Sequence, residues 1–297
     1  MAAMKRLLII LILLTPTSMN GQQHAKVRAD VLAMLDTVQG TFAVAFEDLS
    51  NGSRLLIHEK EMFHAASTMK TPVMIEAFAQ CREGRFSLDD SLVIRNEFRS
   101  IVDSSTYQLD LKDDSDDSMY KRLGTKCTVR ELVYHMITVS SNVATNILID
   151  LVGAEKVTRR MRLIGAANIE VLRGVEDGKA FERGLNNRTS ALDLLMIMRE
   201  IARGTAVDSS SSRAMMEVLL AQKFRDLIPA LLPADIRVAH KTGSITGVEH
   251  DSGIVFLPDG RRYVLVLLSK DLRDAESGKR LIALVSKRIY DFVTEGM

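Results

Sequence analysis

The sequence predicts a mixed α/β fold in which the strands come from both ends of the chain and the helices come mostly from the middle. Strand-like runs occur at residues 41–48, 54–58, 237–243, 253–257 and 262–268. Between about residues 66 and 222 the apolar residues instead recur at helical spacing. We therefore expect an antiparallel sheet assembled from two distant segments, with a largely helical region between them.

The composition is that of a globular chain without a strong electrostatic field. Of the 297 residues, 46% are hydrophobic, which suits one large domain or two closely packed ones with a sizeable core. The 39 basic and 38 acidic residues leave a net charge of +1, so the charge pattern would not recruit nucleic acid or an anionic membrane. We expect a small-molecule or peptide-like partner.

Residues 1–21 have the organisation of a secretory signal peptide. A basic pair precedes an unbroken apolar run at residues 7–14, and a polar stretch follows. Eight apolar residues are too few to span a bilayer. Cleavage between Ser18 and Gln22 would release a periplasmic or secreted protein; an uncleaved membrane anchor is the alternative.

The two cysteines leave two states open. In an oxidising compartment Cys81 and Cys127 could pair, closing a loop whose entropy is worth about 4 kcal/mol. Two buried free thiols fit the sequence equally well, because the sequence does not give the separation of their Cα atoms.

No stretch of the sequence has the spacing of a metal site. The six histidines are scattered, and neither cysteine has a neighbour at ligand spacing, so we expect no metal and no other cofactor. The acidic cluster at residues 113–117 lacks the glycine and the terminal glutamate of an EF-hand loop. We interpret it as a solvated surface loop.

The first elements in the chain are a helix and a hairpin. Residues 25–35 carry apolar side chains on one side and predict an amphipathic helix. The strand at 41–48 and its partner at 54–58 are joined by a turn at Asn51 and Gly52. A helix laid on an antiparallel hairpin follows from this order.

Ser67 and Lys70 begin the next helix. At positions i and i+3 they share one face, which places an amine beside the hydroxyl of a serine that needs a base to become a nucleophile. The apolar run at residues 69–81 surrounds them, and burial lowers the pKa of a lysine toward the range of a base. Pro72 falls early enough in the helix to be accommodated. Alone, this motif also fits a capped helix with a solvent-facing lysine.

A second polar pair lies between two further helices. Thr128 is a candidate N-cap, with Glu131 three residues later, for a helix that runs to about Val139. Ser140 and Asn142 follow, just before the next apolar helix. A short connector there can turn a hydroxyl that shuttles a proton, and an amide that holds a carbonyl or the lysine, toward one cleft. A further helix cap is the alternative.

The third polar group ends a strand near the C-terminus. Lys241 and Thr242 place a cation and a hydroxyl at the edge of the sheet, and Gly243 follows where the backbone must approach a ligand closely. These groups suit a carboxylate and an oxyanion. The chain then closes with an amphipathic helix at residues 276–293.

Three motifs in this order, Ser67-x-x-Lys70, Ser140-x-Asn142 and Lys241-Thr242-Gly243, resemble those of the penicillin-binding proteins and class A β-lactamases. The resemblance covers nearly the whole mature chain, and residues 128–132 and 144–146 are also similar to class A sequences. It implies a five-stranded antiparallel sheet flanked by helices, plus an all-helical domain. Residues 22–64 and 223–297 would form the first domain, and residues 65–222 the second.

The resemblance also implies the roles of the site residues. Ser67 would attack the lactam carbonyl, with its proton leaving through Lys70, and Ser140 would pass a proton to the departing nitrogen. The backbone N–H groups of Ser67 and Ser244 would hold the oxyanion, and Lys241 with Thr242 would bind the substrate carboxylate. The substrate-binding positions as a whole would be Asn142, Asn186, Lys241, Thr242, Gly243 and Ser244.

Hydrolysis of the acyl-enzyme would need a glutamate and a water, and Glu182 with Asn186 matches the Glu-x-x-x-Asn pattern of class A enzymes. Ala180 stands where the family usually has an arginine, and the next helix begins at about residue 191, so the loop is short and differently fastened. Another departure lies in the second motif, where Ser141 replaces the usual aspartate.

The third motif also departs from the family pattern, because no arginine follows it until Arg261. His250 and Asp251 are the candidates for the place of the usual carboxylate-binding arginine.

These features predict a serine β-lactamase of class A type that confers β-lactam resistance. The expected partner is a small-molecule β-lactam, with no nucleic acid, no membrane partner after signal removal, and a monomeric state. One alternative is a D-alanyl-D-alanine peptidase or penicillin-binding protein whose acyl-enzyme persists. Another, from a different class, is a noncatalytic cell-wall binding module.

Overall fold

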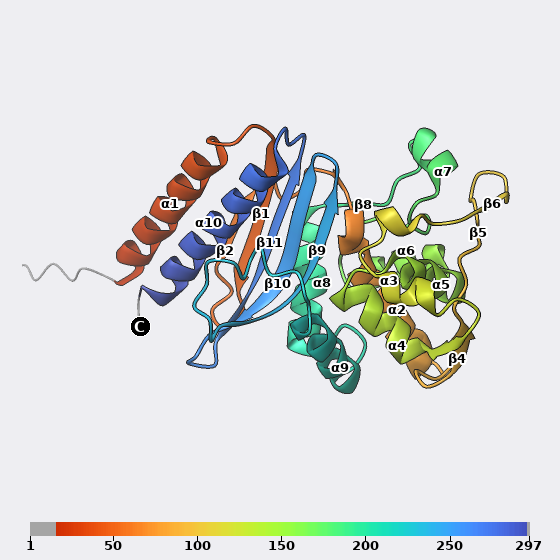
Figure 1. Ribbon diagram of the computed structural model, residues 1–297. Coiled ribbons are helices and arrows are strands. Elements are labelled where there is room, and N and C mark those ends of the chain that lie inside the picture. The colour runs from red at the N-terminus through yellow and green to blue at the C-terminus, as the bar shows by residue number, and fades with distance from the viewer. Residues whose placement is uncertain (1–15, 296–297) are drawn as a thin grey trace, which may run out of the picture.

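The computed structural model describes residues 16–295 and shows a five-stranded antiparallel sheet with helices on both faces, joined to a group of helices at one side (Figure 1). The predicted fold class is therefore confirmed. The strands lie in the order β2-β1-β11-β10-β9. Their bounds are β1 Thr41–Asp48, β2 Arg54–Ile57, β9 Arg237–Ile245, β10 Val248–Phe256 and β11 Arg262–Lys270.

The two ends of the chain meet inside this sheet. Strand β1 pairs antiparallel with β11, from Thr41 opposite Lys270 to Asp48 opposite Tyr263. Strand β1 is buried on both faces, so its apolar residues run on without interruption. The larger side chains, such as Phe42 and Phe46, enter one core, and the small Ala43 and Ala45 enter the other.

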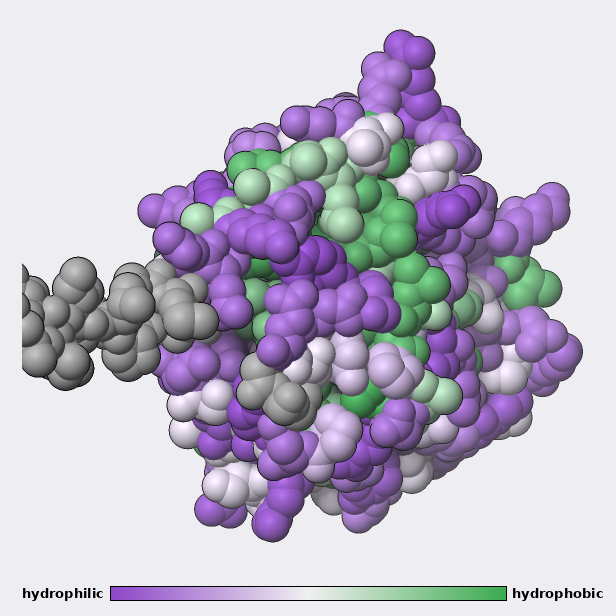
Figure 2. All heavy atoms as spheres, turned by 90° about the vertical axis from the view of Figure 1, so that its left-hand side faces the viewer, coloured by the Kyte–Doolittle hydropathy of each residue, from purple (hydrophilic) through white to green (hydrophobic). Residues whose placement is uncertain are grey.

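Helices α1 (Pro16–Leu35) and α10 (Ala275–Thr294) cover one face of the sheet (Figure 1). Val27 and Val31 of α1 and Val285 and Ile289 of α10 are fully or almost fully buried in the core on this face. The outer surface that these helices present is mostly hydrophilic around a smaller hydrophobic area (Figure 2). Helix α1 is longer than the predicted helix at 25–35. Residues 1–15 of the predicted signal lie outside the described residues.

The opposite face is covered by α8 (Ala191–Arg203), which packs on β1, β10 and β11. Ser190 begins this helix, because its hydroxyl accepts from the backbone N–H of Asp193 and donates to the Asp193 carboxylate. The other helices are α2 Lys70–Arg82, α3 Asp117–Lys121, α4 Val129–Thr138, α5 Asn142–Val152, α6 Ala154–Leu163, α7 Gly178–Glu182 and α9 Ser209–Leu220. How residues 65–222 divide from the rest as a domain stays a prediction.

Three two-stranded pairs and two short 3₁₀ turns complete the elements of residues 16–295. The pairs are β3 Phe63–His64 with β8 Arg188–Thr189, β4 Ser91–Val93 with β7 Lys126–Thr128, and β5 Phe98–Arg99 with β6 Thr106–Tyr107. The turns are η1 Ala66–Met69 and η2 Leu111–Asp113. Thr128 caps α4 by accepting from the Glu131 backbone N–H, as predicted.

The interpretation of residues 113–117 as a solvated loop is wrong in part. The Asp114 carboxylate accepts hydrogen bonds of 2.9–3.1 Å from the backbone N–H groups of Asn142 and Val143, where the positive end of the α5 dipole favours an anion. Asp116 is buried, and its carboxylate is 2.8 Å from Nδ1 of His135. Contact with two helices therefore fixes this acidic segment.

Two further observations concern the cysteines and the helices. Cys81 and Cys127 are both free thiols, and burial raises the pKa of each to about 11. Within residues 16–295, no helix combines the length and the apolar character needed to cross a membrane.

Candidate active site

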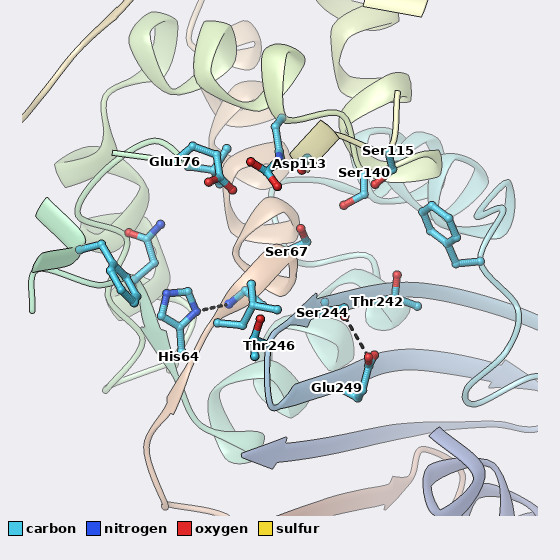
Figure 3. Close-up of a pocket in the computed structure, with 18 of the residues that line it drawn as sticks. His64, Ser67, Asp113, Ser115, Ser140, Glu176, Thr242, Ser244, Thr246 and Glu249 are labelled. Atoms are coloured by element: carbon cyan, nitrogen blue, oxygen red, sulfur yellow. Dashed lines mark hydrogen bonds between the residues drawn. The ribbon is translucent and has the colours of Figure 1, made fainter. Parts of the chain in front are cut away.

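A cavity of about 750 Å³ brings the three sequence motifs together. Ser67 lies at its centre, between the loop that carries Glu176 and the strand that carries Thr242 (Figure 3). The predicted residues that line it are Ser67, Ser140, Asn142, Thr242, Gly243 and Ser244. Segments separated by about 175 residues of chain therefore form one site.

The nucleophile turn is η1, which leads directly into α2. Ser67 is half-buried, and its side chain faces the cavity. The preceding Ala66 has a φ of +45°, a conformation that costs energy in a residue other than glycine, and its N–H donates to Nδ1 of His64 at 3.0 Å. Since amides in the first turn of a helix lack an intrahelical acceptor, the Ser67 N–H is available for an oxyanion.

Strand β9 lies directly against this turn because residue 243 is a glycine. A Cβ at Gly243 would come within 3.0 Å of the backbone nitrogens of Ser67 and Thr68. The close contact holds β9 directly against the turn that carries Ser67. The glycine predicted to permit a close approach of the backbone is thus packed against the nucleophile turn itself.

Lys70 is completely buried and is held by the second motif. Its Nζ donates to the Ser140 carbonyl at 2.6 Å, to Asn142 Oδ1 at 2.8 Å and to Ser140 Oγ at 3.2 Å. Burial lowers the pKa of Lys70 to about 7, while the carboxylates of Asp114 and Glu176 act in the opposite direction. Among residues 16–295, the Ser140 and Asn142 oxygens are the partners of the Lys70 amine, and the predicted contact of the amine with the Ser67 hydroxyl is not among them.

Ser140 links the two lysines of the site. Its Oγ accepts from Lys241 Nζ at 3.1 Å as well as from Lys70, so its own proton is left to point elsewhere. Burial, and then the proximity of Lys70, holds the pKa of Lys241 well below its usual range. The backbone of Ser140 has a φ of +59°, which turns the residue back between the lysines. The cluster can therefore pass a proton from one amine to the other through Ser140.

Glu182 and Asn186 are not brought to the nucleophile. Glu182 ends α7, is exposed to solvent and does not line the cavity. The cap on this short helix fixes its direction, since the Asp177 carboxylate accepts from the Ala180 N–H at 3.1 Å. Asn186 does not line the cavity either, and its Oδ1 accepts from Arg173 Nη2 at 3.0 Å.

Of the carboxyl groups that line the cavity, Glu176 is the one on the loop opposite Ser67, and sequence reasoning missed it (Figure 3). Burial, and then the charge of Asp113, raises the pKa of Glu176, while the cations of Arg173 and Lys70 oppose the rise. Its φ of +59° holds it in a conformation that is uncommon outside glycine. The only signal in the sequence is the acidic pair of Glu176 and Asp177, which lacks the expected spacing to Asn186.

Arg173 and Asn187 fasten this loop. The guanidinium of Arg173 donates from Nε to the Leu185 carbonyl at 2.8 Å and also binds Asn186. Asn187 accepts from the backbone N–H groups of Leu172 and Arg173 and donates to the Arg173 carbonyl at 3.0 Å. The arginine that is missing at position 180 is therefore replaced by one that precedes Glu176.

His250 and Asp251 do not occupy the expected carboxylate-binding place. Both are completely buried, and neither lines the cavity. The two ring nitrogens of His250 bond to the backbone of Glu249, Ser269 and His64, and the Asp251 carboxylate binds His240 and the Ile228 N–H. With every polar atom of the two groups engaged by the protein, neither is free for a ligand.

A model of the beta-lactamase enzyme family matches residues 26–293. The chain belongs to the beta-lactamase enzyme family. Within the family, extended-spectrum beta-lactamase PER-1 of Pseudomonas aeruginosa is 24% identical over 248 residues, covering 80% of this chain and 78% of PER-1. A beta-lactamase of Bacteroides uniformis is 24% identical over 288 residues, covering 93% of this chain and 94% of that relative.

Among solved structures, PBP-A is 26% identical to this beta-lactamase-family chain, with a TM-score of 0.79 and coverage of 92% of this chain and 97% of PBP-A. A mutant of PBP-A has been solved as an acyl-enzyme complex with penicillin-G. The suspected resemblance is confirmed, and the chain is a serine β-lactamase-like hydrolase by family and fold. In residues 16–295 no three His, Cys, Asp or Glu side chains are grouped to hold a metal ion, and the expected absence of a cofactor stays a prediction.

Proposed function

We propose that this protein is a class A serine β-lactamase that hydrolyses the β-lactam amide through an acyl-enzyme on Ser67. One observation carries the proposal: Ser67 and Glu176 line one cavity, and Lys70, with a pKa of about 7, is hydrogen-bonded to Ser140 and Asn142 of the same cavity. The enzyme would be exported to the periplasm or the medium, act as a monomer and confer resistance to β-lactam antibiotics.

In the first half-reaction Ser67 Oγ attacks the lactam carbonyl. Lys70, neutral in an appreciable fraction at pH 7, takes the serine proton, and the N–H groups of Ser67 and Ser244 stabilise the oxyanion. The C–N bond then breaks as Ser140 delivers its proton to the nitrogen. Ser140 recovers a proton from the lysines that flank it, so the protons balance.

In the second half-reaction Glu176 is the base, in place of the predicted Glu182. Its raised pKa brings it nearer to the working pH, where proton transfer from a water is most effective. The water oxygen attacks the ester carbonyl, and the bond to Ser67 Oγ breaks. The proton taken by Glu176 returns to the serine through Lys70, with which Glu176 interacts electrostatically.

A second candidate function is that of a penicillin-binding protein whose acyl-enzyme persists. The likeness to PBP-A and the short loop around Glu176 favour it. The two candidates share acylation and differ only in whether the loop delivers a water to the ester.

Intact-protein mass, followed over time after mixing with excess benzylpenicillin, separates them. For the wild type we expect an adduct that clears as product accumulates, and none in S67A. E176Q should trap the adduct, while E182Q, a matched change of a solvent-facing glutamate, should clear it like the wild type. A trapped adduct in E182Q but not in E176Q would refute the assignment of the base. A stable adduct in the wild type would instead identify a penicillin-binding protein.

A further inference from the structure

One end of the cavity has a negatively charged wall. Glu249, on β10, is 4% exposed and lines the cavity beside Thr242 and Ser244 (Figure 3). Asp226 and Lys279 line the same end. The Lys279 ammonium lies 3.2 Å from a carboxylate oxygen of Asp226 and 3.2 Å from one of Glu276. This end therefore has three carboxyl groups, those of Glu249, Asp226 and Glu276, and one ammonium group, which already forms ion pairs with Asp226 and Glu276.

Glu249 also fixes what the neighbouring hydroxyl can offer to a ligand. Ser244 and Glu249 are directly opposite each other in the β9–β10 pair, and Ser244 Oγ donates to Glu249 Oε1 at 2.9 Å. A hydroxyl has a single proton, so Ser244 presents only lone pairs to the cavity. Oε2 of Glu249 accepts no hydrogen bond from the described residues. Both groups are thus acceptors that a donor or a cation would satisfy.

Ser140 shows which part of a β-lactam reaches this wall. Because Ser140 protonates the departing nitrogen, the ring attached to that nitrogen lies on the Ser140 side of Ser67. Lys241 joins Ser140 to β9, and Thr242 and Ser244 continue along the strand toward Glu249. In a cephalosporin that ring carries the substituent at carbon 3, which would point along the same strand.

We propose that Glu249 selects β-lactams that carry a positive charge on the ring fused to the lactam. This inference rests on the proposed function. The substrate carboxylate keeps to Lys241 and Thr242, and the cationic substituent reaches Glu249 and Asp226. Burial raises the pKa of Glu249, with Asp226 and Glu276 adding to the rise and Ser244 and Lys279 opposing it. A nearby cation would favour the ionised form.

Two cephalosporins provide a matched pair of substrates. Cephaloridine and cephalothin share one acyl side chain and differ at carbon 3, where the first has a pyridinium and the second an acetate ester. The measured quantity is the ratio of kcat/KM for cephaloridine to kcat/KM for cephalothin. We expect this ratio to be about fivefold higher in the wild type than in E249Q, which lacks the charge of Glu249. E182Q, which removes a carboxylate that faces solvent, should keep the wild-type preference.

D226N serves as a second test, since Asp226 is about half-exposed and its substitution leaves the sheet untouched. It should lower the preference by about half, even if E249Q does not fold. An equal preference in the wild type, E249Q and D226N would overturn the inference while leaving the proposed function intact. If neither cephalosporin forms a mass adduct or is hydrolysed, the proposed function fails and the inference fails with it.

Discussion

Replacing Gly243 by alanine tests how closely the strand must approach the nucleophile. The added Cβ would lie 3.0 Å from the nitrogens of Ser67 and Thr68 and 3.2 Å from the Cβ of Ala66. Ordinary van der Waals contact begins at about 3.4 Å, so the turn or the strand must shift by a few tenths of an ångström. Two of the three contacts are backbone atoms, which cannot move away by a change of side-chain rotamer.

The size of the effect follows from this overlap. Overpacking of this kind costs about 1–3 kcal/mol of stability. A misplacement of about 1 Å at a reacting centre costs ~100-fold in rate, so a shift of about half that size predicts a loss of ~10-fold in acylation of Ser67. Stopped-flow acylation by benzylpenicillin measures the rate, and urea unfolding measures the stability.

Gly253 provides the matched control in the same sheet. A Cβ there would meet the Cβ of His240 at 3.0 Å and Val238 Cγ1 at 3.2 Å, which is similar crowding away from the nucleophile turn. G253A should lose similar stability and keep the acylation rate. An acylation rate of G243A equal to that of the wild type would refute the reasoning. An equal loss of acylation rate in G243A and G253A would show that general destabilisation is the cause.

Three further predictions concern charged groups. Lys70 must be neutral to accept the serine proton, so the acylation rate should rise as pH increases through about 7 and level off above it; a flat profile from pH 5 to 9 would exclude Lys70 as the base. Glu47 is 1% exposed and binds Arg54 and Arg203, so E47A should cost about 2 kcal/mol in urea unfolding, and an unchanged midpoint would contradict this. Burial acts to raise the pKa of Asp116, but hydrogen bonds from His135 and Ser118 prevail and hold it at about 2. Its stabilisation is therefore complete above the unfolded pKa of about 4 and is lost as pH falls to about 2, and D116N should flatten this part of the stability profile.

The sheet and the three motifs could be predicted because local chemistry determines them. Strands β1 and β11 are long and buried, so their apolar residues reveal them directly. Strand β10 begins at Val248, five residues before the predicted start, because its first half is polar although it is buried. Ser67 and Lys70 stand within one turn at the start of α2, as their spacing predicts. Thr128 and Glu131 form the cap that their spacing predicts, because the contact lies within one turn of helix.

The parts that sequence reasoning missed depend on contacts between distant segments. Glu182 is predicted from its spacing to Asn186, but spacing alone does not show which way the loop turns. The Asp177 carboxylate caps α7 and the Arg173 guanidinium binds the Leu185 carbonyl, so that Glu182 faces solvent and Glu176 lines the cavity. Asp114 caps a helix that begins 28 residues later, which no local pattern reveals. The role of His250 could not be predicted for the same reason. Only the folded sheet shows that its two ring nitrogens are hydrogen-bonded to backbone groups and are not available to a ligand.

The pairing of β1 with β11 has a consequence for the order of events during folding. Strand β9 is joined to β1 only through β10 and β11, so the sheet around the turn of Ser67 is complete only when Lys270 is opposite Thr41. Contacts that close such long segments form slowly, whereas helices such as α2 and α4 form from neighbouring residues. A chain still emerging from the ribosome thus has its nucleophile but lacks the strand that completes the oxyanion site. Labelling by penicillin during refolding would report the moment at which the two ends of the chain meet.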